Sequence, residues 1–389
     1  MNTVSVHGWV DPAFSSCLDA FRENFAADAE QGASCAIYRH GEPILDAWGG
    51  IAVAGRNTPW TEDTVVPVFS ITKGVAALCV LSLVSGGRFG LNQSVAQYWP
   101  SFGAHGKDRI SIAEALGHRA GVPTITGSIT LEDLAHPQEM SARLAAENPL
   151  FEPGTAHFYH ASTVGWITTE LVRRATGQQM GDWFRKNLAE PLGLNIQIGR
   201  KAGDETPIAV VEVPAKHDTP ALDPLSFPGT VLSLNGLFVP SMSGLAAAMN
   251  DPVVQRLELA GANGMADARS LAKLYSEAVI GTRGEALLSS ACIREATTVV
   301  SEGKQWGIEL SGPTWGAGLM LPWDVQPMLG PGSFGHDGAG GSLAFVHAPS
   351  GVSFAYVRNR AGQPNVADPL VYRVVKALAD CLGLHVPKL

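Results

Sequence analysis

The sequence has few charged residues, no run of basic residues, no Cys-x-x-Cys pair and no long apolar stretch. Only 16% of its 389 residues are charged and the formal net charge is −9, which argues against nucleic-acid binding because phosphate contacts need a clustered basic face. The longest apolar run, residues 75–84, is interrupted by Ser82 and is too short to cross a bilayer. We therefore expect neither a nucleic-acid partner nor a membrane partner.

The cysteines are scarce and scattered, at positions Cys17, Cys35, Cys79, Cys292 and Cys381. Their odd number and wide spacing predict free, mostly buried thiols in a reducing compartment. The first ten residues contain no cationic region followed by an apolar stretch, so we expect no signal peptide and predict a cytoplasmic location.

The length exceeds what one hydrophobic core usually supports, so we expect two lobes. Alternating apolar residues predict strand hairpins at 34–48 and 343–357. Helical periodicity is found at 11–29, 161–175, 264–280 and 370–382. This order predicts a sheet lobe built from residues 1–80 and 305–389, a mostly helical lobe at 81–304, and an active site between them. The pattern does not indicate an oligomeric state.

Ser70-Ile-Thr-Lys73 has the setting of an activated nucleophile. Short apolar residues precede it at 64–69, and residues 74–81 predict a buried helix. A serine at a helix start and a lysine one turn later share a face, so the lysine can activate the serine. The free N–H groups and the positive dipole end of the helix also favour an oxyanion there. We predict that Ser70 is the nucleophile and that Lys73 activates it.

The Ser-x-x-Lys pattern alone is weak, because this chain contains it three times. The copy from Ser270 to Lys273 lies inside a helical pattern with no strand before it, which indicates a surface and core helix. The copy from Ser301 to Lys304 is polar and contains a glycine, which predicts a loop. Only the copy at Ser70 has a strand before it and a core helix after it.

Two further segments carry chemically capable groups. Tyr159 stands just before the helix predicted at 161–175, where a tyrosine is usually a cap or a packing residue. Residues 334–342 are so rich in glycine that their backbone must pass close to another group. Taken by itself, that segment is as consistent with a structural turn plus bulge as with a functional loop.

Together and in this order, Ser70-Ile-Thr-Lys73, Tyr159-His-Ala161 and His336-Asp-Gly338 resemble the motifs of the serine β-lactamase and penicillin-binding-protein superfamily. The likeness is closest to its class C β-lactamase-like branch, which includes the family VIII carboxylesterases, and covers about residues 15–382. Other matching segments include Leu116-Gly-His-Arg-Ala-Gly-Val-Pro123, Trp315-Gly-Ala-Gly318 and Tyr356-Val-Arg-Asn359. The resemblance implies an α+β, β-lactamase/transpeptidase-like fold, in which helices flank an antiparallel sheet and a mostly helical lobe is inserted.

The resemblance also implies roles for individual residues. Ser70 attacks a carbonyl while Lys73 and Tyr159 share the removal of its proton, and a nearby ammonium would favour a tyrosinate at Tyr159. The backbone N–H groups of Ser70 and Ala339 would form the oxyanion hole. His336, Gly338 and His160 are expected to bind or orient the substrate, and neither a metal nor another cofactor is expected.

The chain departs from the β-lactamases of this branch at two positions. Ala161 stands where they carry asparagine, and His336 stands where many of them carry lysine. Both changes remove contacts to a β-lactam, so we predict a serine carboxylesterase that cleaves small, short-acyl esters through an acyl-enzyme. The apolar segment 219–242 is expected to line or cover the cleft and to disfavour long acyl chains. The α/β-hydrolase signature Gly-x-Ser-x-Gly is missing.

Three alternatives share these motifs. A β-lactamase or D-amino-acid peptidase would use the same residues, and so would an acyltransferase in which an alcohol or amine replaces water. A protein of another class, a non-catalytic scaffold, would retain the fold and lose the chemistry.

Overall fold

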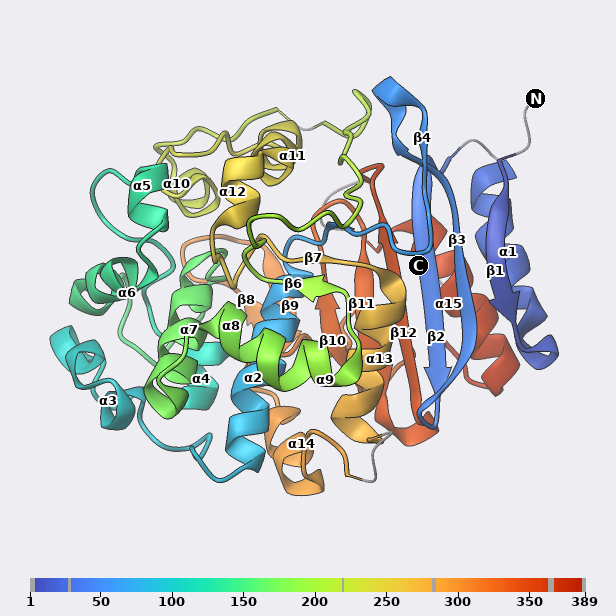
Figure 1. Ribbon diagram of the computed structural model, residues 1–389. Coiled ribbons are helices and arrows are strands. Elements are labelled where there is room, and N and C mark those ends of the chain that lie inside the picture. Colours follow the sequence, from blue (N-terminus) through green and yellow to red (C-terminus); the bar gives the residue numbers. More distant parts are fainter. Residues whose placement is uncertain (1–3, 27–28, 219, 282–284, 363–366, 387–389) are drawn as a thin grey trace.

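An antiparallel sheet joins the two ends of the chain in the computed structural model, which describes residues 4–26, 29–218, 220–281, 285–362 and 367–386 (Figure 1). The strand order is β1-β3-β2-β12-β11-β10, with β4 paired to β3. The strands are β1 (Val6–Val10), β2 (Gly32–Arg39), β3 (Glu42–Val53), β4 (Thr58–Pro59), β10 (Ser333–Asp337), β11 (Leu343–His347) and β12 (Val352–Arg358). The pairing of β2 with β12 confirms the predicted sheet built from both termini.

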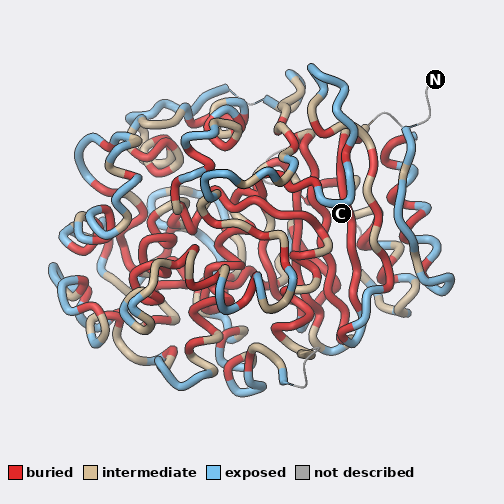
Figure 2. Tube along the Cα trace, viewed as in Figure 1, coloured by how far each residue is buried: buried red, intermediate tan, exposed pale blue. Residues whose placement is uncertain are grey.

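Helices cover both faces of the sheet at β2, β11 and β12, which are buried nearly throughout, whereas the edge strand β1 is largely exposed (Figure 2). Successive side chains of a strand point to opposite faces, so Cys35 and Ile37 belong to one core while Ala36 and Tyr38 belong to the other. The first core is shared with α1 (Ser15–Ala26) and α15 (Pro369–Leu382), and the second with α2 (Ile71–Ser85) and α13 (Ala268–Val279). Helices on both sides of an antiparallel sheet confirm the predicted fold class.

The closing helix α15 shows how the local sequence sets an element. Asp368 caps its first turn by accepting hydrogen bonds from the N–H groups of Leu370 and Val371. Pro369 follows at the first helical position, where its missing N–H does no harm. Gly383 ends the helix in the left-handed conformation, with φ at 66°. The predicted helix at 370–382 is therefore confirmed.

Helices predominate between the two groups of sheet strands. They are α3 (Val95–Tyr98), α4 (Ile112–Leu116), α5 (Leu131–Leu134), α6 (Pro137–Ala146), α7 (Thr163–Thr176), α8 (Met180–Phe184), α9 (Glu190–Leu192), α10 (Phe227–Ser233), α11 (Met242–Asn250), α12 (Pro252–Arg256) and α14 (Ser290–Ala296). The short strands are β5 (Val66–Pro67), β6 (Ile196–Gln197), β7 (Met265–Ala266), β8 (Ser301–Lys304) and β9 (Ser311–Trp315). The helices predicted at 161–175 and 264–280 are found as α7 and α13.

Two elements differ from the predictions made from the sequence, one in its bounds and one in its type. The N-terminal helix α1 is shorter than 11–29, since a 3₁₀ turn precedes it, and residues 27–28 lie outside the described residues. Residues 301–304 are not a loop, so that prediction was wrong: they form β8, which pairs with β9. Gly303 is left-handed, with φ at 78°, and the register shifts beside it. A bulged, mostly exposed strand of polar residues has no apolar alternation to reveal it.

The division into lobes at residues 80 and 304 stays a prediction. One helix from the middle range, α13, packs directly on β2, β11 and β12 of the sheet. In the described ranges, no helix has the length and apolar character needed to cross a bilayer.

Candidate active site

Ser70 lies at a strained turn between β5 and α2. Phe69, the residue before it, is buried and adopts a left-handed backbone with φ at 48°, which is unfavourable for a residue with a bulky side chain. Ser70 is the N-cap residue of α2, yet its side chain makes no capping hydrogen bond. The turn therefore directs the Ser70 hydroxyl away from the helix end and leaves it available for other partners.

Lys73 lies one turn further along α2 and is only 5% exposed. Its Nζ is 3.0 Å from Ser70 Oγ and donates a hydrogen bond to the carbonyl oxygen of Gly261 over 2.5 Å. The loop before β7 thus fixes the amine through a second hydrogen bond. The predicted contact between Lys73 and Ser70 is present.

Tyr159 reaches the same hydroxyl from another part of the chain. Its OH donates a hydrogen bond to Ser70 Oγ over 2.9 Å, and Lys73 Nζ lies 4.8 Å from the centre of its ring. The ring stacks on Trp315 at 5.6 Å, and the Tyr159 N–H donates to Gln305 Oε1 over 2.8 Å. The structure therefore brings together the three residues predicted to carry the chemistry and supports the tyrosine through the β8–β9 hairpin.

Burial shifts the pKa values of the two assisting groups in opposite directions. Loss of solvent lowers the pKa of Lys73 to about 7, an effect that the charge of Asp337 partly opposes. Loss of solvent also raises the pKa of Tyr159 above its ordinary value, although the hydrogen bond to Ser70 opposes the rise. The expected tyrosinate beside an ammonium is therefore not what this environment favours. A neutral amine with a neutral phenol fits it better, which makes Lys73 the stronger proton acceptor.

The glycine-rich segment 338–342 begins beside the turn that carries Ser70. A side-chain carbon at Gly338 would lie 2.4 Å from the carbonyl oxygen of Val68, so only glycine allows this approach. Ala339 follows directly, and within the described residues neither its N–H nor that of Ser70 donates a hydrogen bond to the protein. Both N–H groups are therefore available as the donors that an oxyanion hole needs, and their action there stays a prediction.

His336 lies at the end of β10 and is 1% exposed. Its ring packs 5.2 Å from Trp315 and 6.5 Å from Tyr159. Nδ1 donates to the carbonyl oxygen of Asp337 over 2.6 Å, which leaves Nε2 as the acceptor. Nε2 is buried and has no partner in the described part of the chain, so it is free to accept a hydrogen bond.

His160 is not placed to contact a substrate. It is fully buried, its Nε2 accepts from the N–H of Val122, and its Nδ1 donates to the carbonyl oxygen of Phe158. Burial lowers its pKa to about 4, so the ring is neutral. His118 accepts from the His160 N–H and packs its ring against Tyr159 and Trp315. Both histidines therefore fix the loop that carries Tyr159, and the predicted substrate contact of His160 is corrected to this supporting position.

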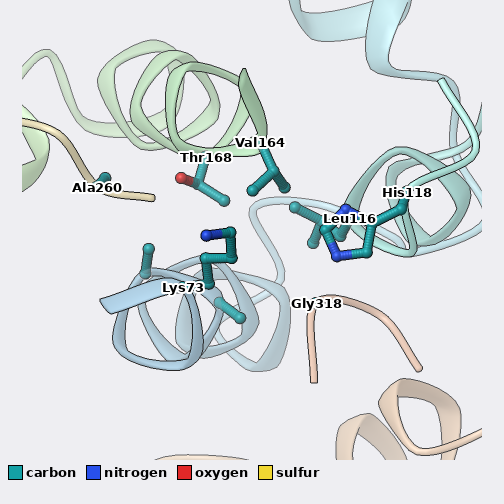
Figure 3. A pocket seen from close by; sticks show the side chains of 9 residues that line it. Lys73, Leu116, His118, Val164, Thr168, Ala260 and Gly318 are labelled. Atoms are coloured by element: carbon teal, nitrogen blue, oxygen red, sulfur yellow. The ribbon is translucent and has the colours of Figure 1, made fainter. Parts of the chain in front are cut away.

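A small cavity lies behind Lys73, between α2 and α7 (Figure 3). Its volume is about 10 Å³, which is room for about one water molecule. Lys73, Thr168 and His118 supply polar groups to a mostly apolar lining. This cavity is too small for an ester, so it belongs to the environment of the amine and not to substrate binding.

Ala161 packs into a separate apolar cluster with Phe151, Phe158 and Val231. Thr219 lies outside the described residues, but α10 of the predicted cleft-lining segment reaches this cluster. There Phe227 lies 4.5 Å from Phe158 and 5.3 Å from Trp306, measured between ring centres. The segment thus contacts the residue next to Tyr159, while its effect on the cleft stays a prediction.

The other two Ser-x-x-Lys copies are structural. Ser270 is buried in α13 and accepts from the N–H of Asn195, while Lys273 donates to the carbonyl oxygen of Leu192. Ser301 is buried and donates to the carbonyl oxygen of Gly117. Among the described residues, no group of three or more His, Cys, Asp or Glu side chains is placed to hold a metal ion.

Three residues that shape the site were not predicted from the sequence: Gln305, Gly261 and the strained Phe69. Gln305 and Gly261 act through contacts that link distant segments, for which a single sequence carries no local signal. Trp315 lay within a segment that contributed to the family resemblance, but its stacking on Tyr159 was not expected.

Comparison with known proteins matches residues 19–378 to the Beta-lactamase family. The chain is 32% identical over 370 residues to the "Esterase/beta-lactamase LipL" of Mycobacterium tuberculosis strain H37Rv, covering 93% of this chain and 84% of the relative. A solved family VIII carboxylesterase is similar with a TM-score of 0.86 and 32% identity, over 97% of this chain and all of the other. EstA from Arthrobacter nitroguajacolicus Rue61a gives a TM-score of 0.87 and 30% identity, over 97% and 99%.

Proposed function

This chain belongs to the Beta-lactamase family, and from that premise we propose that it is a serine carboxylesterase acting on small, short-acyl esters through an acyl-enzyme. The observation that carries the proposal is the position of Ser70 Oγ, held 3.0 Å from Lys73 Nζ and 2.9 Å from Tyr159 OH. Relatives named as esterases, similar along nearly the whole chain, support the choice of ester as substrate.

In acylation, the neutral amine of Lys73 takes the proton of the Ser70 hydroxyl as Oγ bonds to the ester carbonyl carbon. The carbonyl oxygen becomes an oxyanion, which the N–H groups of Ser70 and Ala339 bind. When the intermediate collapses, the bond from the carbonyl carbon to the alcohol oxygen breaks. Tyr159 donates its proton to the departing alkoxide, and the Lys73 ammonium replaces that proton.

In deacylation, water replaces the alcohol. The neutral amine of Lys73 removes a proton from the attacking water as the water oxygen bonds to the carbonyl carbon. The bond from that carbon to Ser70 Oγ then breaks, Tyr159 gives its proton to the Ser70 oxygen, the Lys73 ammonium replaces the proton of Tyr159, and the carboxylic acid leaves. His336 supports substrate orientation, because its buried Nε2 can accept a hydrogen bond beside Tyr159.

The second candidate is hydrolysis of β-lactams at the same site. The relative from Mycobacterium tuberculosis, LipL, is named an esterase/beta-lactamase, which supports this candidate. Against it stand Ala161, whose methyl group offers no amide to a substrate, and His336, which is not a permanent cation as lysine would be.

The five free cysteines, four of them buried, support the further proposal of a reducing, cytoplasmic setting. Localisation of a tagged full-length chain by cell fractionation tests this proposal independently of the chemistry.

The decisive experiment combines activity with covalent labelling. The purified chain is assayed on p-nitrophenyl esters of graded acyl length and on a chromogenic cephalosporin, and a fluorophosphonate adduct is located by peptide mass spectrometry. We expect ester hydrolysis and an adduct on Ser70. The Ser270→Ala variant is the matched control, since it removes the serine of another Ser-x-x-Lys copy. Hydrolysis of neither substrate, without labelling of Ser70, would support the non-catalytic scaffold.

A further inference from the structure

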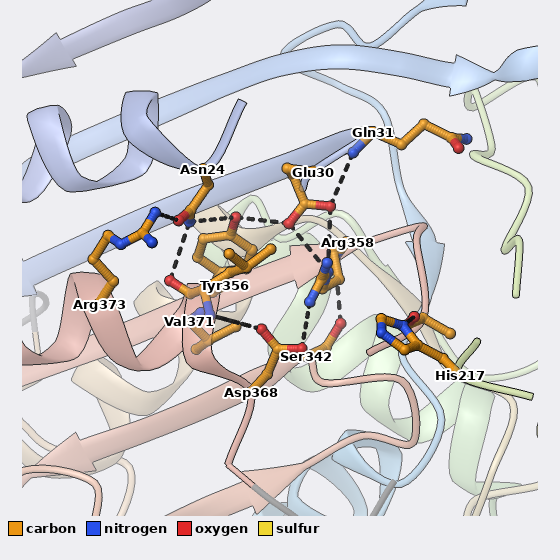
Figure 4. A network of polar contacts seen from close by, with 12 residues as sticks. Asn24, Glu30, Gln31, His217, Ser342, Tyr356, Arg358, Asp368, Val371 and Arg373 are labelled. Carbon is orange, nitrogen blue, oxygen red and sulfur yellow. Dashed lines mark hydrogen bonds and ion pairs between the residues drawn. The ribbon is translucent and has the colours of Figure 1, made fainter. Parts of the chain in front are cut away.

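A buried network of polar and ionic contacts joins the end of β12 to α1 and α15 (Figure 4). Arg358, the last residue of β12, lies between two carboxylates. Its Nη1 is 2.5 Å from Asp368 Oδ2, and its Nε is 3.1 Å from Glu30 Oε2. The three side chains are at most 3% exposed. Charges buried this deeply are held only where geometry and hydrogen bonds compensate for the lost hydration.

The two carboxylates have different surroundings. Glu30 accepts a hydrogen bond from Tyr356 OH over 2.9 Å, and Asn24 extends this branch toward α15 through Arg373. Asp368 caps α15 and faces the turn that follows β10. The Glu30 branch therefore ties helices to the sheet, while the Asp368 branch reaches the loop beside the active site.

The contact between Asp368 and this loop is tight. A side-chain carbon at Gly341 would lie 2.8 Å from Asp368 Oδ2, and one at Gly362 would lie 1.9 Å from the same atom. The two glycine segments are also joined, because the Gly362 N–H donates to the carbonyl oxygen of Gly340 over 2.9 Å. The carboxylate thus packs directly against the backbone of Gly341 and Gly362, and Gly341 is left-handed with φ at +99°.

The loop itself is closed and carries Ala339. The Gly338 N–H donates to the carbonyl oxygen of Ser342, and Ser342 Oγ accepts from the Arg358 N–H. On its other side, Gly338 packs against Val68, two residues before the nucleophile. The loop is therefore held between the Ser70 turn on one side and the Asp368–Arg358 pair on the other.

We propose that Asp368, fixed by Arg358, is a positioning residue that sets the Ala339 N–H at the oxyanion hole. This inference rests on the proposed function, since it assigns work to the oxyanion hole of that reaction. Asp368 touches no substrate and acts only through the backbone of residues 338–342.

The network provides its own matched control. Asp368→Asn keeps the capping ability at α15, because asparagine caps as well as aspartate, and it removes one charge. Glu30→Gln removes one charge from the same arginine but leaves the contact with Gly341 and Gly362 unchanged. Both variants lose one negative charge beside Arg358, so that loss alone would not separate them.

We expect Asp368→Asn to lower kcat on p-nitrophenyl butyrate at least about tenfold with little change in KM, a part of the roughly 100- to 1000-fold loss that follows removal of a whole oxyanion donor. Affinity for an alkyl boronic acid, which forms a tetrahedral adduct on the serine, should fall by the same factor. Glu30→Gln should keep wild-type values for both, with melting temperatures recorded for each variant.

Equal values of kcat and boronic-acid affinity in Asp368→Asn and Glu30→Gln would overturn the inference while leaving the esterase intact. Should Asp368→Asn fail to fold, Asp368→Ser decides the question, because serine also caps a helix but lacks the carboxylate that packs against Gly341 and Gly362. Unchanged kcat and boronic-acid affinity in that variant would also overturn it. An inactive, unlabelled wild-type chain would instead refute the proposed function.

Discussion

The pH dependence of ester hydrolysis should report the ionisation of Lys73. Burial lowers the pKa of this amine to about 7, from 10.5 for an ordinary lysine. Below that pH the amine is an ammonium and cannot accept the Ser70 proton, whereas above it the amine is neutral and can. We therefore expect kcat/KM to rise with pH and to level off above pH 8.

The expected fall in kcat/KM at low pH follows from the fraction of molecules in which the Lys73 amine is neutral. At pH 5, two units below the pKa of Lys73, about 1% of the molecules carry a neutral amine, so kcat/KM should be about 100-fold below its plateau. Burial raises the pKa of Tyr159, so its hydroxyl should stay protonated and cause no decline below about pH 10. An exposed lysine would place the inflection more than three units higher.

The assay is the initial rate of p-nitrophenol release from the butyrate ester between pH 5 and 10, at constant ionic strength. His336→Gln controls for the histidine near Tyr159 and should keep the inflection near pH 7. Lys73→Arg, whose guanidinium stays charged, should remain slow at every pH. A flat profile, or an inflection that disappears in His336→Gln, would refute the assignment to Lys73.

Stability provides a readout that does not depend on catalysis. Between about pH 7 and 10.5 the unfolded chain binds a proton at Lys73 that the folded chain does not. The free energy of unfolding of the wild type, relative to Lys73→Met, should therefore increase with pH across this window. A constant difference would contradict the lowered pKa.

Three further outcomes are expected. Ser70→Ala should lose ester hydrolysis and fluorophosphonate labelling with unchanged circular dichroism; an adduct on Ser270 or Ser301 would reject the nucleophile. Tyr159→Phe should lower kcat about 100-fold or more, and a change in KM alone would remove the tyrosine from the chemistry. kcat/KM on the acetate or butyrate ester should exceed kcat/KM on a cephalosporin by at least about 100-fold, which is about 2.7 kcal/mol in transition-state binding. Esters with long acyl chains should have a lower kcat/KM than these short esters. Comparable kcat/KM on esters and cephalosporins would favour the β-lactamase alternative.

The chain sequence predicted the elements whose signals are local. Alternating apolar residues revealed the hairpins at both ends, and helical periodicity revealed α7, α13 and α15. The Ser70–Lys73 spacing also belongs to this class, because residues three apart on one helix share a face wherever that helix lies. The bulged, exposed strand β8 escaped detection, since its glycine and polar residues imitate a loop.

The ordered motifs predicted which distant residues belong to one site, but only the tertiary structure showed how they meet. Tyr159 contacts Ser70 although 89 residues of sequence separate them. Gln305 and Trp315 of the β8–β9 hairpin support the tyrosine, and no local sequence pattern predicted these two contacts. His160 was expected near a substrate, yet its ring nitrogens are bonded to backbone on both sides. Orientation of a side chain depends on partners from elsewhere in the chain, which local sequence does not specify.

The sequence by itself predicted the family, most of the main helices and strands, and Ser70 as the candidate nucleophile, because each prediction follows from residue types at short or ordered spacing. The tertiary structure decided the direction in which the pKa of Lys73 shifts, since that pKa depends on how completely distant segments exclude water from the amine. It also decided how the Ala339 loop is held, between Val68 and the Asp368 carboxylate. Burial and close backbone contact are properties of the packed chain, so they arise only when its distant parts come together.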